Sequence, residues 1–140
     1  MSIVLNWFDE KNTVLLYTFE GSWTWEEFHE LDDPVWELVA TVGYRIDLII
    51  DWTRSAGFPL GIMSSMHRAG ENVIPQTDGL TISIGGPYLI KIMLGIFRRT
   101  YPKAAGAYRL VDSLDEAITL LEQERGEAII KSISPFKQSH

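Results

Sequence analysis

The sequence predicts an α/β protein with a single mixed, mostly parallel sheet that begins with an N-terminal β-hairpin. Short apolar runs typical of strands alternate along the chain with longer segments of helical spacing. Turn residues separate the first two runs, and no repeat, linker or low-complexity segment divides the 140 residues. The expected order is β-β-α-β-α-β-α-β-α, in one domain over residues 1–126, followed by a C-terminal tail over residues 127–140.

The hairpin comes from two apolar runs, residues 2–8 and 12–19, which are joined by the turn-forming segment Asp-Glu-Lys-Asn. A helix is expected to follow, because Thr24 and Glu27 have the spacing of a capping box. In this motif the threonine hydroxyl accepts a hydrogen bond from a first-turn amide, and the glutamate reaches back to the cap residue.

Pro34 interrupts the apolar stripe of this first helix, so we expect a kink there or two short helices in sequence. Gly43 is the expected helix stop. The segment IDLIIDW, residues 46–52, is the strongest strand signal in the chain. Its near-continuous apolar run indicates a central strand that is covered on both faces.

The remaining elements follow from prolines, glycines and a second capping box at Ser113. We expect a loop over residues 53–58, a helix from Pro59 to near Gly70, a strand over residues 80–84, a helix from Pro87 to about Thr100, a last strand over residues 107–111 and a helix from Ser113 to near Gly126. The tail is expected to add one helical turn before Pro135 and then to fray.

Composition excludes several classes of function. The chain has no cysteine, which excludes disulfides, thiol catalysis, iron–sulfur clusters and cysteine-based zinc sites, and a cytoplasmic location is expected. The net charge of −7 disfavours binding to nucleic acid. No signal peptide and no apolar stretch of about 20 residues is recognised, so stable membrane insertion is not expected. The three histidines lack metal-ligand spacing, and neither a metal nor a cofactor is predicted.

Charge is distributed unevenly along the chain. Six acids crowd into the first predicted helix: Glu26, Glu27, Glu30, Asp32, Asp33 and Glu37. Five bases and no acid occur over residues 87–109: Lys91, Arg98, Arg99, Lys103 and Arg109. Two solvated helix faces would explain this pattern, and so would electrostatic complementarity with a partner or a second copy.

The end of the predicted central strand is the first place where a ligand would be expected, because ligands of open α/β sheets gather beyond the carboxyl ends of the strands. Asp51, Trp52, Arg54 and Ser55 are the ligand-binding candidates there, unless this segment is a plain surface loop. Trp52, with Trp23, could also line an apolar pocket or belong to the edge of the core. The two glycines after the strand at residues 80–84 lack a nucleotide-binding pattern and predict a tight turn.

The helix over residues 88–97 is apolar nearly all round, which indicates burial on more than one side. The sheet can cover only one of these sides. We therefore predict a homodimer with Tyr88, Ile92, Met93 and Ile96 in the interface, while a helix fully enclosed within one chain is the competing explanation.

The element order, the turn FEGSWTWEEF and the closing DSLDEAITLL resemble the STAS superfamily, the fold of bacterial anti-sigma factor antagonists. The resemblance covers about residues 12–122 and is nearest to the divergent bacterial STAS/SEC14-like proteins. It implies the fold and a habit of binding partners or lipid-like ligands. Regulatory members carry an Asp-Ser-Ser-Gly-like motif that is phosphorylated, whereas residues 55–61 here read SAGFPLG, so the phosphorylation switch does not carry over.

These observations favour a non-enzymatic binding or regulatory module that acts through protein contacts. The alternative is a small carrier of an apolar or amphipathic ligand, which the aromatic residues and the flexible Met63, Met66 and Met93 suggest. A third hypothesis is an enzyme that uses Asp51, Arg54 and His67.

Overall fold

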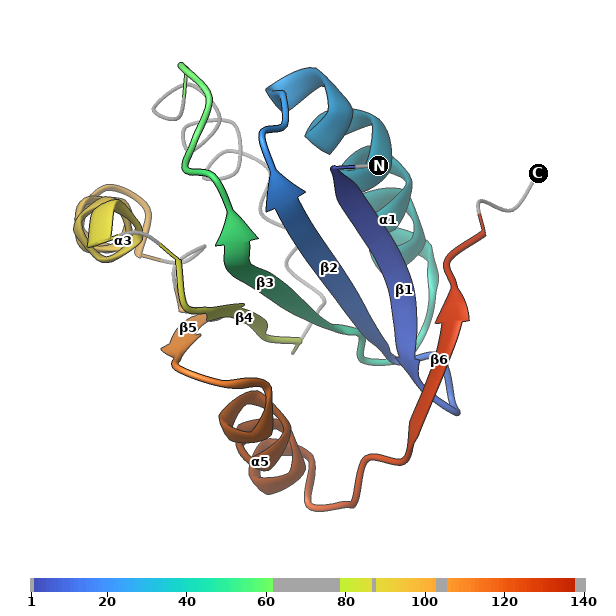
Figure 1. The fold of residues 1–140 in the computed structure, drawn as a ribbon. Helices are drawn as coiled ribbons and strands as arrows, with labels where there is room; N and C mark the ends of the chain where they lie inside the picture. Colours follow the sequence, from blue (N-terminus) through green and yellow to red (C-terminus); the bar gives the residue numbers. More distant parts are fainter. Residues whose placement is uncertain (1, 62–78, 87, 103–105, 138–140) are drawn as a thin grey trace.

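The computed structural model describes residues 2–61, 79–86, 88–102 and 106–137, and over these residues it is an α/β protein with one mixed sheet (Figure 1). The strands are β1 (Ile3–Asp9), β2 (Val14–Gly21), β3 (Asp47–Ser55), β4 (Thr81–Ile84), β5 (Tyr108–Val111) and β6 (Lys131–Pro135). The helices are α1 (Trp25–Thr41), α3 (Tyr88–Thr100) and α5 (Leu114–Arg125). The prediction of an α/β protein with one mixed sheet that begins with a β-hairpin is therefore confirmed.

The six strands lie in the order β5-β4-β3-β2-β1-β6. The strands β2, β3, β4 and β5 are mutually parallel, and β1 is antiparallel to both of its neighbours, β2 and β6. The prediction that IDLIIDW forms an interior strand is confirmed, because β3 pairs on both sides and Ile49 is completely buried. Since β2, β3 and β4 begin side by side, the register brings their first residues together.

β6 corrects the prediction for the tail and the prediction of the last strand. Residues 131–135 do not form a helical turn but a strand that pairs with β1, so the strand at residues 108–111 is not the last one. β6 is mostly exposed and carries no run of inward apolar residues. Its position depends on backbone pairing with a distant strand and on the contact between Trp7 and Phe136, whose ring centroids are 5.7 Å apart.

Helices cover both faces of the sheet, with α1 on one side and α5 on the other (Figure 1). The core under α1 consists of Ile3, Leu5, Leu15, Tyr17, Phe19, Trp23, Val35, Val39, Ile46, Leu48 and Trp52. The core under α5 consists of Phe8, Val14, Ile49, Leu80, Ile82, Ile84, Ala117 and Leu121. Successive residues of one strand enter different cores, as Val14 and Leu15 do, because side chains alternate across a strand.

Both predicted capping boxes begin a helix. The Thr24 hydroxyl accepts a hydrogen bond from the Glu27 amide at 3.1 Å, and the Ser113 hydroxyl accepts one from the Glu116 amide at the same distance. α5 ends where it was expected to end, at Gly126, whose φ of 72° is the left-handed conformation that glycine adopts without strain.

Of the two outcomes expected at Pro34, a kink or two short helices, the second is wrong, because α1 is one helix through that residue. Burial of Val35 and Val39 beneath the helix holds the turn against the sheet, which offsets the hydrogen bond that proline cannot donate. The helix also ends at Val42 and not at Gly43, since the Val42 amide bonds to the Leu38 carbonyl in an ordinary extended conformation.

The expected loop at residues 53–58 begins later than predicted, since β3 continues to Ser55 beside the end of β2. The helix expected from Pro59 to Gly70, with Met63, Met66 and His67, lies for the most part outside the described residues. None of the helices in the described ranges has the length and apolar character that a membrane span requires.

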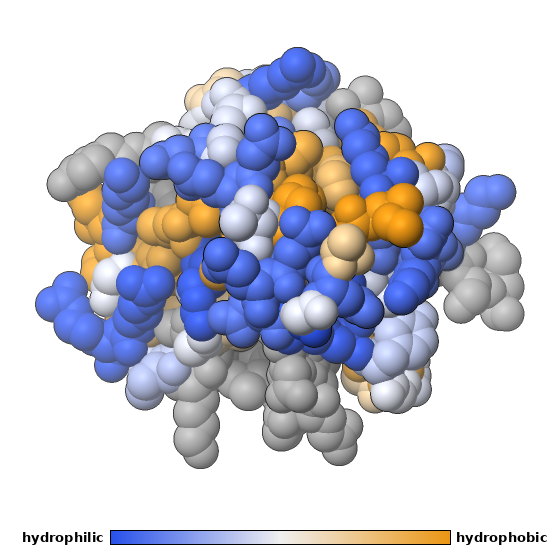
Figure 2. Space-filling model, turned by 90° about the horizontal axis from the view of Figure 1, so that it is seen from below, coloured by the Kyte–Doolittle hydropathy of each residue, from blue (hydrophilic) through white to orange (hydrophobic). Residues whose placement is uncertain are grey.

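Seen from below, the molecule presents mainly hydrophilic residues, with hydrophobic ones visible between them (Figure 2). α5 accounts for part of this pattern. Its inner face buries Ala117 and Leu121, and its outer face exposes Asp115, Glu116 and Glu124.

Candidate functional site

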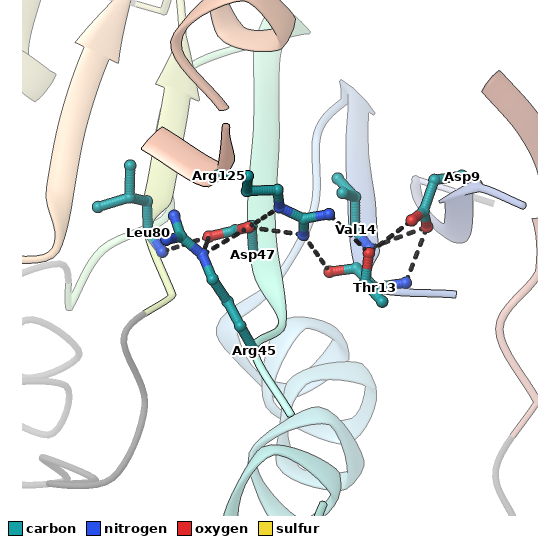
Figure 3. Close-up of polar contacts among 7 residues, drawn as sticks. All are labelled: Asp9, Thr13, Val14, Arg45, Asp47, Leu80 and Arg125. Atoms are coloured by element: carbon teal, nitrogen blue, oxygen red, sulfur yellow. Dashed lines mark hydrogen bonds and ion pairs between the residues drawn. The ribbon is translucent and has the colours of Figure 1, made fainter. Parts of the chain in front are cut away.

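The amino ends of the parallel strands hold the most extensive polar cluster of the described chain, centred on Asp47 (Figure 3). The Asp47 side chain is completely buried and lies at the start of β3. Its oxygens accept hydrogen bonds from Arg45 Nε at 3.0 Å, from Arg125 Nε at 2.8 Å and from the Leu80 amide at 2.7 Å. The carboxylate thus joins the chain before β3, the chain before β4 and the end of α5.

Arg125 extends this cluster to the β1–β2 turn. Its guanidinium donates to Thr13 Oγ1 at 2.8 Å and to the Thr13 carbonyl at 3.0 Å. Thr13 in turn donates to the buried carboxylate of Asp9, which also accepts the Val14 amide at 3.0 Å. Two acids and two arginines balance in charge, and this cluster lies at the end of the sheet opposite to where ligands of α/β proteins bind. We interpret the Asp47 cluster as structural.

The four predicted ligand-binding residues at the end of β3 have separate partners. Asp51 Oδ1 accepts from the Thr53 amide at 2.9 Å and from the Thr53 hydroxyl at 2.6 Å. Arg54 donates to Glu20 on β2 at 2.8 Å, and both side chains are at least half exposed. Ser55 accepts from Trp23 Nε1 at 2.9 Å and donates to the Gly57 carbonyl at 2.8 Å. These described contacts do not bring the four side chains onto one pocket.

The fourth of these residues, Trp52, belongs to an aromatic cluster with Phe19, Trp23, Trp25, Phe28 and Phe58. Trp52 stacks on Phe19 with a centroid distance of 4.3 Å, and Trp23 meets Trp25 edge-on at 4.7 Å. The rings therefore pack against one another, and Trp23 and Trp52 lie in the core under α1. Trp52 Nε1 is buried and has no hydrogen-bond partner among the described residues.

A pocket of about 350 Å³ lies at the carboxyl ends of β4 and β5. It is bounded by Gly85 and Gly86 after β4, by Lys91 on the first turns of α3 and by Asp112 and Glu116 at the start of α5, with Leu110 and Val111 of β5 also in its lining. We call it the β4–β5 pocket.

Backbone geometry requires glycine in the turn that borders the β4–β5 pocket. Gly85 and Gly86 both have positive φ, 63° and 95°, and the Gly85 amide donates to the Val111 carbonyl at 3.1 Å. A Cβ atom on Gly85 would lie 2.8 Å from Cγ2 of Thr53, so glycine is required there for both conformation and space. Sequence reasoning treated the two glycines only as a turn. A single sequence does not reveal that β4 and β5 are adjacent. This adjacency brings Lys91, Asp112 and Glu116 into the lining of the pocket.

The predicted interface residues lie on α3, which begins at Tyr88. Ile92 is 45% exposed, Met93 and Ile96 are half-buried, and Phe97 is buried against Tyr108 with a centroid distance of 5.3 Å. Ile92, Ile96 and Arg99 share one helix face because they are four and then three residues apart. We call Ile92, Ile96 and Arg99 the α3 surface; Arg98, which is also exposed, lies about 120° around the helix from Ile92.

α1 presents the opposite charge. Glu26, Glu30, Asp33 and Glu37 are exposed and recur at helical spacing, so they form one acidic stripe along the helix. Of the other two acids in the predicted group, Glu27 is also exposed. Asp32 points to the core and accepts hydrogen bonds from the Tyr17 hydroxyl at 2.6 Å and from Trp36 Nε1 at 2.8 Å.

Burial and the nearby negative charge of Asp32 raise the pKa of two tyrosines. The pKa of Tyr17 lies well above its ordinary value, first because of burial and then because of Asp32, which also accepts its hydrogen bond. The pKa of Tyr108 is raised to about 12 by the same two causes in the same order. Both side chains are therefore neutral at physiological pH.

Comparison with known proteins adds no assignment: no family model matches the chain, and no curated protein is significantly similar to it in sequence. Over the described ranges no group of three or more histidine, aspartate or glutamate side chains is placed to hold a metal ion.

Proposed function

We propose that this protein is a non-enzymatic binding or regulatory module of the cytoplasm that acts through protein contacts, first of all with a second copy of itself. The observation that carries this proposal is the α3 surface, where Ile92 is 45% exposed on the same helix face as Arg99. An apolar centre with a charged rim is the composition expected of a protein interface.

The acidic stripe of α1 supports a second copy as the partner. A two-fold dimer would bring α3 of each copy toward the other, with its basic residues near the acidic stripe of the partner copy. Such rim charges steer association and add little affinity, so the apolar residues supply most of the binding energy.

The resemblance to STAS domains supports a regulatory role of this kind. The role proposed does not use phosphorylation: Thr53 and Ser55 are the hydroxyls near the position of the family's motif, and both donate hydrogen bonds, to Asp51 and to the Gly57 carbonyl.

Sedimentation equilibrium tests the proposal. The wild type is expected to have twice the 15.9 kDa mass of one chain, and Ile92→Asp is expected to weaken the dimer at least tenfold, since it places a charge in the apolar centre of the interface. The matched control is Ile133→Asp on β6, which changes an isoleucine of similar exposure, 48%, and should leave the dimer intact. A wild type that remains a monomer at high micromolar concentration would refute the proposal, as would equal weakening by both variants.

A carrier of a lipid-like ligand is the alternative function, and mass spectrometry of the purified protein under native conditions tests it. Its support is weakened by the aromatic cluster, because the rings that suggested an apolar pocket are in contact with one another. The β4–β5 pocket has three charged side chains in its lining, which is unsuited to an acyl chain.

A further inference from the structure

We infer that the β4–β5 pocket binds a small zwitterion that carries one ammonium and one carboxylate group, such as a free α-amino acid. This inference does not depend on the dimer. The position of the β4–β5 pocket supports the inference, because the pocket lies beyond the carboxyl ends of two adjacent parallel strands, where α/β sheets bind their ligands. A volume of about 350 Å³ lies near the lower end of the range for small-molecule sites.

Charge is the second argument. Lys91 and Asp112 both line the pocket and are both exposed, yet neither side chain has an ion-pair partner within the described ranges. Opposite charges that line one pocket without pairing leave room for a ligand that pairs with each. An anion alone would be repelled by Asp112 and Glu116, and a cation alone would be repelled by Lys91.

Geometry assigns the two ends of the ligand. Glu116 is partly committed, because its Oε2 accepts the Asp112 amide at 2.9 Å and thereby fixes the start of α5 beside the pocket. The ligand ammonium would lie between Asp112 and Glu116. The ligand carboxylate would lie toward Lys91, on the side of the pocket that Gly85 and Gly86 form. Leu110 and Val111 provide apolar contact for a short side chain.

The test is a set of NMR titrations of the full chain, in which amide shifts are followed as each of the common L-α-amino acids is added to about 10 mM. At least one amino acid is expected to shift the amides of Gly85, Gly86 and Asp112 in a saturable way. The corresponding amine, which lacks the carboxylate, and the corresponding carboxylic acid, which lacks the amine, are expected to bind at least tenfold more weakly.

Two variants and two matched controls assign the contacts. Lys91→Met and Asp112→Asn are each expected to weaken binding at least tenfold. Lys131→Met on β6 and Asp115→Asn on α5 change exposed residues of the same types outside the pocket and should leave binding unchanged. The inference is overturned if no amino acid causes saturable shifts, if the amine or the acid binds as well as the zwitterion, or if the pocket variants bind like their controls.

Discussion

Asp47 is the centre of the most extensive polar cluster among the described residues. Its carboxylate pairs with two guanidinium groups, of which that of Arg125 is only 8% exposed. Removing one partner of a buried ion pair leaves the other charge without compensation, which makes such a change more damaging than the pair's net contribution suggests.

We therefore expect Asp47→Asn to lower the free energy of unfolding by about 3–5 kcal/mol, as measured by urea denaturation. Glu20→Gln is the control, because it removes an ion pair whose side chains are 50% and 71% exposed, and it should change stability by about 1 kcal/mol or less. Equal effects of the two substitutions would show that the Asp47 cluster does not hold the strands together.

Tyr108 lowers the free energy of unfolding as the pH rises into the alkaline range. The unfolded tyrosine ionises near pH 10, whereas the folded one keeps its proton until about pH 12. Its contribution is therefore fully present below pH 10 and is lost as the pH rises toward 12, at a rate of about 1.4 kcal/mol per pH unit. Urea unfolding at about pH 9 and about pH 11 measures this slope.

Tyr108→Phe should make that slope shallower. The matched control variant is Tyr44→Phe, which changes a tyrosine that is 55% exposed. Tyr17 adds to the slope in both variants, since its pKa is raised as well. An unchanged slope in Tyr108→Phe would contradict the burial of this side chain beside Asp32.

At the level of elements, β3 is the interior strand on which both cores meet. Ile49→Ala is expected to cost about 2–5 kcal/mol of unfolding free energy, because Ile49 is completely buried in the core under α5. Ile133→Ala on β6, where the side chain is 48% exposed, should cost much less. A small loss at Ile49, measured by thermal or urea unfolding, would be incompatible with an interior β3.

Elements with a strong local signal were the ones that the sequence predicted well. Thr24 and Ser113 predict helix starts, because each can accept a hydrogen bond from an amide three residues later in the chain. The apolar composition of IDLIIDW predicts a buried strand. β6 has neither signal: its pairing partner is β1, and its exposed residues show no alternation. The continuity of α1 through Pro34 likewise depends on tertiary burial of Val35 and Val39, which no local rule contains.

The candidate site was less predictable than the fold, for a reason that concerns the whole molecule. The rule that ligands lie beyond strand carboxyl ends led to the end of β3, and it applies equally to β4 and β5. Only the sheet order shows that Lys91, near the start of α3, and Asp112, before α5, line the same pocket. Lys91 and Asp112 are far apart in the chain, so their opposite charges come together only in the folded protein.

Whole-molecule integrity depends on β6, which covers the outer edge of β1. A chain shortened to end at Glu127 is expected to associate more strongly than the wild type, because an unpaired strand edge invites pairing between molecules. Light scattering measures this association, and a chain that ends at Lys137 is the control, since it keeps β6. A shortened chain as dispersed and as stable as the control would show that β6 is dispensable.

The pairing of β1 with β6 also has a consequence in time. During translation β1 is synthesised long before β6. One side of the β1 backbone therefore stays unpaired while nearly all of the described chain is synthesised. The β1–β2 hairpin can form early, but the sheet cannot close on that side until the last strand arrives. The nascent protein therefore spends most of its synthesis in a form that is more prone to aggregation than the finished one, and a chaperone that shields Trp7 and its neighbours would act in that interval.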